Sequence, residues 1–345
     1  MKKLHAMSLA VAGLIATTAA FALDSAQPPM AEPKMQKVLD ALASLGGKPV
    51  ETLTSEEARK QPTAADATMK VMKEEGIAAT KDGVTMKQVD IDGPAGKIPL
   101  FVYTPPGKGP FPVVVYFHGG GFVIADTKTY ESSIKAIAAG AKAVVVSVEY
   151  RQAPEHRFPA APDDAFAAYQ WVLANAAEVG GDAGRVAVAG ESAGGNLATV
   201  VALMARDKQV KVPVHQLLIY PVVGDDMNTP SYQRNANAKP LNKAMMAWFF
   251  KHYGADPQNP YALSAKAQTL KGLPPATVLT AEIDPLASEG EAYAQRLRKD
   301  GVQVDYRQFD GVTHEFFGMG AVVPKAVDAQ KFATEGLRKA FEAKR

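Results

Sequence analysis

The chain has 345 residues, 47% of them hydrophobic, and carries a formal net charge of +2 at pH 7. This length can bury a large core and suits a single catalytic domain built on a large α/β sheet. A nearly neutral chain lacks the electrostatic footprint of a nucleic-acid-binding protein, so no nucleic-acid partner is expected. The sequence has no cysteine, which excludes disulfides and lipid attachment to an N-terminal cysteine.

The first 22 residues differ in composition from the rest. Lys2 and Lys3 precede a short apolar stretch, and Ala20-Phe21-Ala22 offers a small-x-small cleavage site. This pattern is typical of a secretory signal peptide. We therefore expect cleavage near Ala22, export to the periplasm or beyond the cell, and no stable membrane anchor. An uncleaved anchor is the alternative, but the apolar core is short for a membrane span.

Two helix-like segments follow, at about 33–46 and 54–79, separated by a Gly-Gly-Lys-Pro turn. We expect residues 23–80 to form a helical cap segment in front of a catalytic domain that covers 81–345.

Strand-like and helix-like runs then alternate, which is the pattern of a mostly parallel sheet flanked by helices on both faces. The expected strands are eight, at residues 84–92, 98–104, 112–117, 143–148, 186–189, 216–220, 276–280 and 304–309. The alternation breaks at about 225–262, where Met and aromatic residues recur at helical spacing. We expect this insertion to complete a cap over the strand ends. An ordinary core helix is the alternative.

A glycine loop follows the third expected strand. His118 is succeeded by Gly119, Gly120 and Gly121. Backbone amides in a loop without side chains can approach a developing oxyanion closely. The amides of Gly120 and Gly121 are therefore candidate oxyanion donors, and a merely flexible loop is the alternative.

The pentapeptide Gly190-Glu191-Ser192-Ala193-Gly194 lies between a strand and a helix-like stretch. In that context the serine is lifted clear of the sheet edge by a sharp, strained turn, and the flanking glycines let strand and helix approach. Ser192 is thus the candidate nucleophile, and the Ala193 amide is a third candidate oxyanion donor.

A nucleophilic serine needs a base, and three histidines follow it: His215, His252 and His314. His215 leads into a strand, and His252 lies in a helix-like stretch. His314 lies in a turn after the last strand, from which an imidazole can reach back over the sheet edge. His314 is the base that we predict.

Three acids compete to orient that histidine: Glu282, Asp284 and Asp310. Asp284 follows the strand 276–280 and precedes Pro285, so its carboxylate is placed at a strand end. Asp310 is more plausible as a turn residue, and Glu282 as a supporting or helix-start acid. We predict Asp284 as the orienting acid.

No sequence feature indicates a cofactor or a metal. His314-Glu315 begins like a zinc-binding helix motif, but position 318 is Gly318 rather than histidine. A phosphate-binding Gly-x-x-x-x-Gly-Lys loop does not occur in the sequence either. We expect chemistry that is independent of cofactors and metals.

Five segments together resemble the hormone-sensitive lipase family of α/β-hydrolases, also called bacterial family IV esterases. They are HGGGF (118–122), VEYRQAPEHRFPAAPDDA (148–165), GESAGGNLA (190–198), AEIDPLASEGEAYAQRL (281–297) and GVTHEF (311–316). The resemblance implies an α/β-hydrolase fold, with Ser192, Asp284 and His314 as the triad. It also implies that the amides of Gly120, Gly121 and Ala193 form the oxyanion hole. Two departures concern pocket shape: many members have Asp in place of Glu191 and Trp in place of Phe122.

The expected activity is therefore that of a serine carboxylesterase acting on small ester substrates of short to medium acyl length. An amidase, deacetylase or thioesterase with the same triad is the competing enzyme. A non-catalytic receptor on the same fold is the competing class, although such a receptor would lack His314. A homodimer is left open.

Overall fold

The computed structural model describes residues 29–79 and 81–343. The predicted signal peptide, residues 1–22, lies outside this part of the chain. The described strands are β1 (Thr85–Gly93), β2 (Gly96–Thr104), β3 (Phe111–Phe117), β4 (Val144–Val148), β5 (Gly181–Glu191), β6 (Gln216–Ile219), β7 (Ala276–Ile283) and β8 (Val304–Thr313). The α-helices are α1 (Pro33–Ser44), α2 (Ser55–Ala58), α3 (Ala64–Glu75), α4 (Glu131–Ala141), α5 (Ala160–Asn175), α6 (Ala193–Asp207), α7 (Pro230–Arg234), α8 (Lys243–Tyr253), α9 (Ala287–Lys299) and α10 (Pro324–Glu342). Short 3₁₀ turns are η1 (Val50–Thr52), η2 (Ala176–Val179), η3 (Ser264–Lys266) and η4 (Phe316–Met319).

The strands form a single eight-stranded sheet with the order β1-β2-β4-β3-β5-β6-β7-β8. β1 pairs antiparallel with β2, and β2 with β4, whereas the pairs from β4 to β8 are parallel. The predicted mostly parallel, eight-stranded sheet is confirmed. Because the parallel strands share one carboxyl edge, side chains that follow β3, β5, β7 and β8 converge there.

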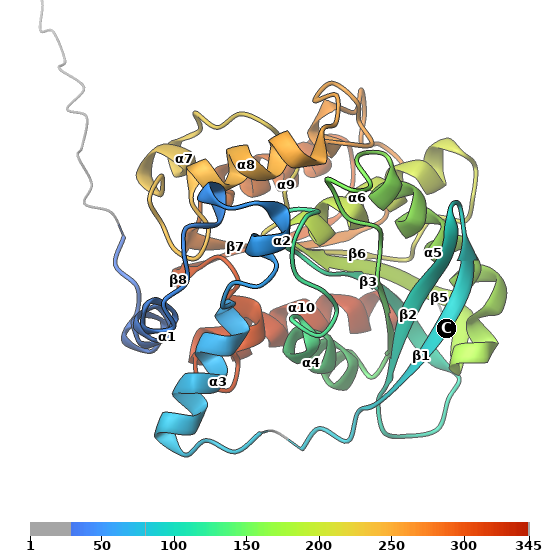
Figure 1. Cartoon of the computed structure of the whole chain (residues 1–345). Coiled ribbons are helices and arrows are strands. Elements are labelled where there is room, and N and C mark those ends of the chain that lie inside the picture. The colour runs from blue at the N-terminus through green and yellow to red at the C-terminus, as the bar shows by residue number, and fades with distance from the viewer. Residues whose placement is uncertain (1–28, 80, 344–345) are drawn as a thin grey trace, which may run out of the picture.

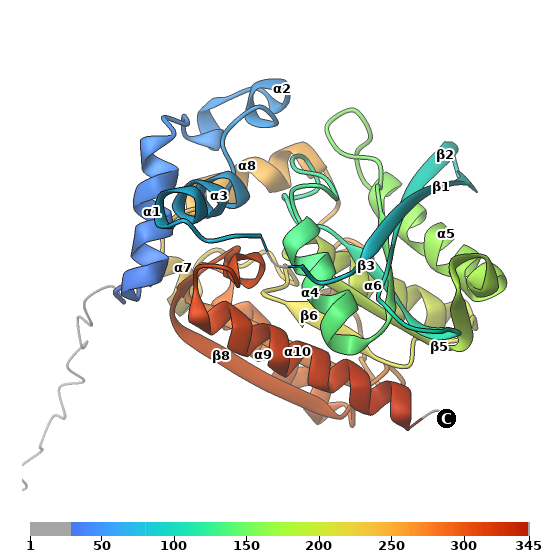
Figure 2. The same cartoon turned by 90° about the horizontal axis from the view of Figure 1, so that it is seen from below.

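Both faces of the sheet are buried, as the continuous apolar runs predict. Val113, Val115 and Phe117 of β3 belong to the core on the face covered by α5, α6 and α9. Val114 and Tyr116 belong to the core on the opposite face, under α4 and α10. Figure 1 shows α4 and α10 below the sheet with α6 and α9 above it, and Figure 2, seen from below, brings α10 and α4 to the front.

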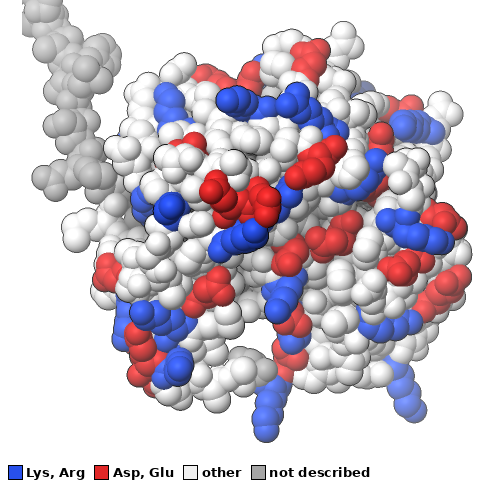
Figure 3. Space-filling view, viewed as in Figure 1, with Lys and Arg blue, Asp and Glu red and all other residues white. Residues whose placement is uncertain are grey.

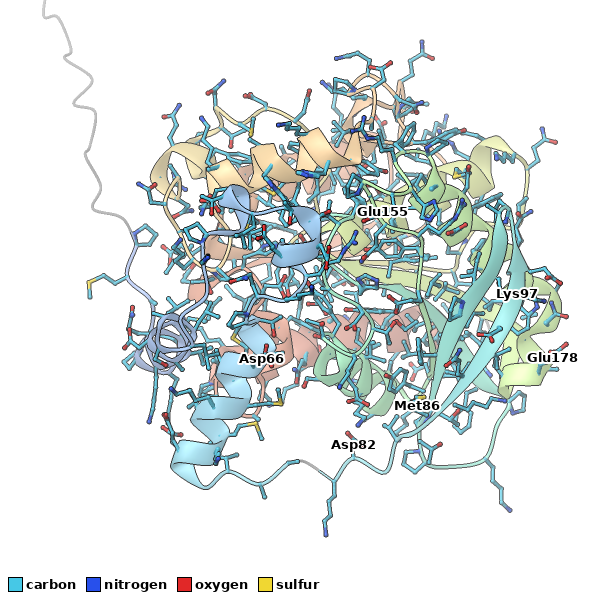
Figure 4. All side chains as sticks on the ribbon, viewed as in Figure 1. Asp66, Asp82, Met86, Lys97, Glu155 and Glu178 are labelled. Atoms are coloured by element: carbon cyan, nitrogen blue, oxygen red, sulfur yellow. The ribbon has the colours of Figure 1, made fainter. Side chains whose placement is uncertain are left out.

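The helix-like segment predicted as one unit at 54–79 is in fact two helices, α2 and α3, so that prediction is wrong. Pro62 has no backbone N–H to continue a helix. Thr63 then starts α3 with a capping box, in which its side chain accepts from the Asp66 amide and Asp66 accepts from the Thr63 amide. Asp66 is labelled at the start of α3 in Figure 4.

The N-terminal helices and the insertion lie side by side. Figures 1 and 2 show α2 and α8 on the same side of the molecule, and the Trp248 indole of α8 donates to the Leu53 carbonyl at 3.1 Å. On the other side, the Arg59 guanidinium bonds both carboxylate oxygens of Glu155, at 2.9 and 2.6 Å. Glu155 is labelled in Figure 4 beside α2. The two segments are thus joined to each other and to the loops around the sheet.

Positive and negative side chains alternate over the visible surface. Figure 3 shows Lys and Arg next to Asp and Glu across this face, without a large field of one sign. Among the helices of residues 29–79 and 81–343, none is long and apolar enough to cross a membrane.

Candidate active site

Ser192 occupies the strained turn that its pentapeptide predicts. β5 ends at Glu191, α6 begins at Ala193, and Ser192 between them has φ 58° and ψ −118°. A residue with a Cβ adopts this backbone conformation only where the surrounding structure imposes it. Here the Ser192 amide donates to the Ile219 carbonyl at 3.0 Å, and its carbonyl accepts from Val222 at 3.1 Å. The neighbouring strand end therefore holds the turn in place.

Gly194 shows why this turn excludes larger residues. A Cβ at this position would lie 1.9 Å from the Phe117 carbonyl oxygen and 2.5 Å from that of His118. Both contacts are far below van der Waals distance. The absence of a side chain at Gly194 thus lets the helix start approach the end of β3, and this brings the glycine loop next to Ser192.

Ser192, His314 and Asp284 form one hydrogen-bonded chain. His314 Nε2 lies 2.9 Å from Ser192 Oγ, and His314 Nδ1 lies 2.6 Å from Asp284 Oδ2. The other Asp284 oxygen accepts the Leu286 amide at 2.8 Å. Asp284 is fully buried, whereas Ser192 is 5% exposed, so exposure to solvent is greatest at the serine end of this chain. The three predicted residues meet although 122 positions separate Ser192 from His314.

The environment of His314 favours its protonated form. Desolvation lowers the pKa of the imidazole, but the Asp284 carboxylate, with smaller contributions from Glu315 and Glu191, outweighs this effect. The net pKa is raised above the ordinary 6.5. His314 is therefore expected to become neutral, and able to act as a base, only above the pH at which an ordinary histidine does.

The glycine loop has the conformation expected of an oxyanion loop. Gly120 and Gly121 have φ values of 98° and 60°, and no described group accepts a hydrogen bond from either amide. The Ala193 amide lies at the first position of α6, where helix amides lack an intrahelical acceptor. At Gly121 a Cβ would lie 2.2 Å from the Phe249 ring of α8, so this loop and the insertion are in direct contact.

His118 belongs to the framework of this loop. Its Nδ1 lies 2.8 Å from the Gly119 carbonyl, and its ring stacks on Tyr150 with centroids 4.4 Å apart. The Tyr150 hydroxyl donates to the His118 carbonyl at 2.8 Å. These contacts fix the backbone of the glycine loop on both sides of His118.

The competing histidines lie elsewhere. His215 is buried at the start of β6 with its Nε2 2.9 Å from Thr277 Oγ1, and burial lowers its pKa to about 4. His252 packs on the Trp248 indole of α8 at a centroid distance of 4.0 Å. Neither approaches Ser192.

The competing acids also take other positions. Asp310 is exposed, and its carboxylate accepts from the Gln308 side chain at 3.2 Å. Glu282 accepts the Gly311 amide at 2.7 Å and so anchors the turn that carries His314. Glu282 therefore supports the histidine loop without touching the imidazole.

A network of carboxylates and phenols behind the triad escaped the sequence analysis. Glu191 is 1% exposed and accepts from the hydroxyls of Tyr116, at 2.6 Å, and Tyr220. Burial raises its pKa to about 7, although both hydroxyls oppose the shift. Tyr220 packs its ring 4.6 Å from that of His314. Glu191 is the variable position directly before the serine of the pentapeptide. Its carboxylate thus supports Tyr220, whose ring flanks His314.

The chain matches the sequence profile of the family described as "alpha/beta hydrolase fold" over residues 114–318. This is more than half of its length. The chain belongs to the hormone-sensitive-lipase-like family of α/β-hydrolases. Membership accounts for the order of the three residues along the chain, Ser192, Asp284 and then His314, and for the glycine loop ahead of them.

Members of this family with similar sequences are ester hydrolases by name. Esterase LipI of Mycobacterium tuberculosis is 44% identical over 255 residues, which cover 72% of this chain and 80% of LipI. The ethyl acetate hydrolase of Pseudomonas putida is 33% identical over 297 residues, or 84% and 92% of the two chains. The crystal structure of a thermostable esterase from Pseudomonas putida has a TM-score of 0.82 and 36% identity, and covers 91% of this chain and 98% of that chain.

Phe122, which many family members replace by Trp, lies at the junction of the glycine loop and α8. Its ring stacks on Tyr253 with centroids 3.9 Å apart and an interplanar angle of 8°. Phe158 meets Tyr253 edge-on at 5.7 Å. The departure at Phe122 is thus accommodated by an aromatic cluster beside the site.

Proposed function

We propose that this chain is a serine carboxylesterase. The observation that carries the proposal is the hydrogen-bonded chain from Ser192 through His314 to the fully buried Asp284. The names of its relatives, which include an ethyl acetate hydrolase, support the same chemistry.

In the proposed reaction Ser192 Oγ attacks the ester carbonyl while His314 Nε2 takes its proton. Asp284 holds Nδ1–H, so that the lone pair of Nε2 faces the serine, and stabilises the imidazolium that forms. The tetrahedral oxyanion is placed at the amides of Gly120, Gly121 and Ala193. His314 then protonates the leaving alcohol, and a water molecule hydrolyses the acyl-enzyme by the same route.

The proposal is tested with matched esters and amides of the same acids, together with a fluorophosphonate that labels nucleophilic serines. We expect ester hydrolysis with burst kinetics and a single adduct on Ser192, detected by intact mass and peptide mapping. Faster turnover of amides than of matched esters would indicate an amidase. No adduct and no turnover of any acyl substrate would contradict the serine-hydrolase mechanism.

We also propose that residues 29–79 and the insertion at about 225–262 act together as a cap that limits the acyl chain. Three contacts support this proposal: Trp248 with Leu53, Phe249 with Gly121, and Tyr253 with Phe122. In the first contact α8 meets the N-terminal segment. In the other two it meets the glycine loop. A pocket closed in this way favours short to medium acyl chains.

We further propose export after cleavage near Ala22, on the pattern of the first 22 residues. The test is the intact mass of material isolated from the native host, which should correspond to a chain beginning near Leu23. Mature protein that retains Met1 and remains in the cytosol would contradict export. A homodimer stays a prediction, to be checked by the mass of the purified protein in solution.

A further inference from the structure

Glu315 adopts a backbone conformation that disfavours it. Its φ of 70° and ψ of 1° lie in the left-handed region, where a Cβ is strained and glycine is free. Neither of its neighbours, His314 and Phe316, is a glycine that could take over this conformation. A glutamate kept at such a position indicates that its side chain contributes something that outweighs the strain.

The side chain of Glu315 joins two parts of the site. Its Oε1 accepts from the Tyr130 hydroxyl at 2.6 Å and lies 3.9 Å from His314 Nε2. Tyr130 in turn lies against the glycine loop, since a Cβ at Gly119 would fall 2.2 Å from the Tyr130 hydroxyl. One carboxylate thus connects the histidine loop, through Tyr130, with the loop that carries the candidate oxyanion donors.

The position of this carboxylate relative to the imidazole is chemically specific. Nε2 is the nitrogen that faces Ser192 and that carries the transferred proton in the proposed mechanism. Asp284 lies on the other side of the ring, 2.6 Å from Nδ1. Two carboxylates therefore bracket the imidazole, and the imidazolium formed in the reaction gains from both.

We propose, on the basis of the proposed serine-hydrolase mechanism, that Glu315 is a positioning residue that places negative charge beside His314 Nε2. Tyr130 fixes this carboxylate in place. The charge favours the imidazolium and so sets the pH at which the base becomes available. Glu315 does not exchange protons with the substrate in this proposal.

Other ionisable groups face the same pair and must be held constant in a test. They are Asp284, Glu191, the phenols of Tyr116, Tyr130 and Tyr220, and the imidazole of His118. Burial raises the pKa of the Glu315 carboxyl, and the nearby His314 and Tyr130 oppose that shift. Replacing Glu315 alone leaves the other groups unchanged.

The experiment measures the rate of Ser192 labelling by a fluorophosphonate from pH 5 to 9. This rate reports the fraction of free enzyme with neutral His314 and requires no knowledge of the natural ester. The proteins compared are the wild type, Glu315→Gln, Glu315→Gly and the control Asp310→Asn. Asp310 is an exposed carboxylate on the same segment that does not contact the imidazole.

Glu315→Gln keeps the shape of the side chain and removes its charge. The midpoint of the labelling profile should fall by about one to three pH units, the range expected for the loss of one charge at about 4 Å between an aqueous and a protein-like effective dielectric constant. Glu315→Gly should show the same direction of shift. Because glycine relieves the backbone strain, this second variant keeps the test usable if the Gln variant folds poorly. Asp310→Asn should keep the wild-type midpoint.

A Glu315→Gln enzyme whose rate is lowered equally at every pH, with the wild-type midpoint, would overturn the proposal and leave Glu315 as a structural hydrogen-bond acceptor. An equal shift in Asp310→Asn would also overturn it, because the effect would then come from overall charge. Failure of the wild type to be labelled at all would instead contradict the serine-hydrolase mechanism. The two failures are therefore distinguishable.

Discussion

Arg59 Nε donates a hydrogen bond to the Val123 carbonyl at 2.8 Å, and so joins the end of α2 to the residues that follow the glycine loop. The same guanidinium donates to the Ala153 carbonyl at 2.9 Å and forms a two-pronged ion pair with Glu155. Its planar fork satisfies three partners at once, which a lysine cannot do. Arg59 therefore couples the N-terminal helices to the geometry of the site.

Replacing Arg59 by Ala should lower kcat/KM by about three- to tenfold. The segment after the glycine loop would lose charge-assisted hydrogen bonds that contribute about 1 kcal/mol to its position. Arg59→Lys should restore only part of the loss. The control is Lys60→Ala on the same turn, since the Lys60 side chain is 70% exposed and pairs with the exposed Glu56. Steady-state kinetics with a short p-nitrophenyl ester provide the measurement. Equal effects of Arg59→Ala and Lys60→Ala would contradict the coupling.

Ser192→Ala and His314→Ala should each lower kcat by about 10⁴- to 10⁶-fold, because the members of a triad act as a unit. Asp284→Asn should also be severe, about 10⁴-fold, since the amide favours the wrong imidazole tautomer. Asp310→Asn should be mild. Circular dichroism controls for folding. An inactive Asp310→Asn enzyme beside an active Asp284→Asn enzyme would reverse the assignment of the acid.

Glu191 should make stability depend on pH. Burial raises its folded-state pKa from 4.5 to about 7, so the folded protein binds a proton that the unfolded chain releases above its ordinary pKa. The stabilisation from this bound proton is fully present below pH 4.5 and is lost as pH rises through about 7. The free energy of unfolding should change by at most about 3 kcal/mol over this range.

The measurement is the Tm between pH 5 and 8. The wild type should lose stability with rising pH across this window, and Glu191→Gln should show a flatter profile because its amide does not titrate. Glu178→Gln, at an exposed glutamate, should retain the wild-type slope. Parallel profiles for the wild type and Glu191→Gln would show that Glu191 does not titrate in this range.

Acyl preference should follow the size of the pocket under the proposed cap. Each buried CH₂ contributes about 0.8 kcal/mol until the chain outgrows the space under α8. We therefore expect kcat/KM for p-nitrophenyl esters to peak at acyl chains of about two to eight carbons, with little activity on emulsified triolein. A preference for long chains, or activity that appears only above the solubility limit, would identify a true lipase with an open cap.

The sequence alone determined the features that depend on neighbouring residues. The strained turn at Ser192 needs small residues on both sides, and the pentapeptide shows them. The eight strands follow from short apolar runs bounded by turn residues, and the order of nucleophile, acid and base follows from the family's chain order. The helix prediction missed the break between α2 and α3. Local residues nevertheless determine this break, namely Pro62 and the capping box at Thr63.

Tertiary structure alone decided the contacts between distant segments. Tyr130 and Glu315 are 185 positions apart, Glu191 and Tyr220 are 29 apart, and Arg59 and Val123 are 64 apart. A glutamate after a histidine, or an arginine at a helix end, is locally ordinary, and its role depends on which group lies within hydrogen-bond reach. Which groups come within reach depends on how the parallel strands align at their carboxyl ends and on how α2 and α8 pack against the loops there. Packing of the whole chain controls both, because the free energy of burying these surfaces far exceeds that of any single pair.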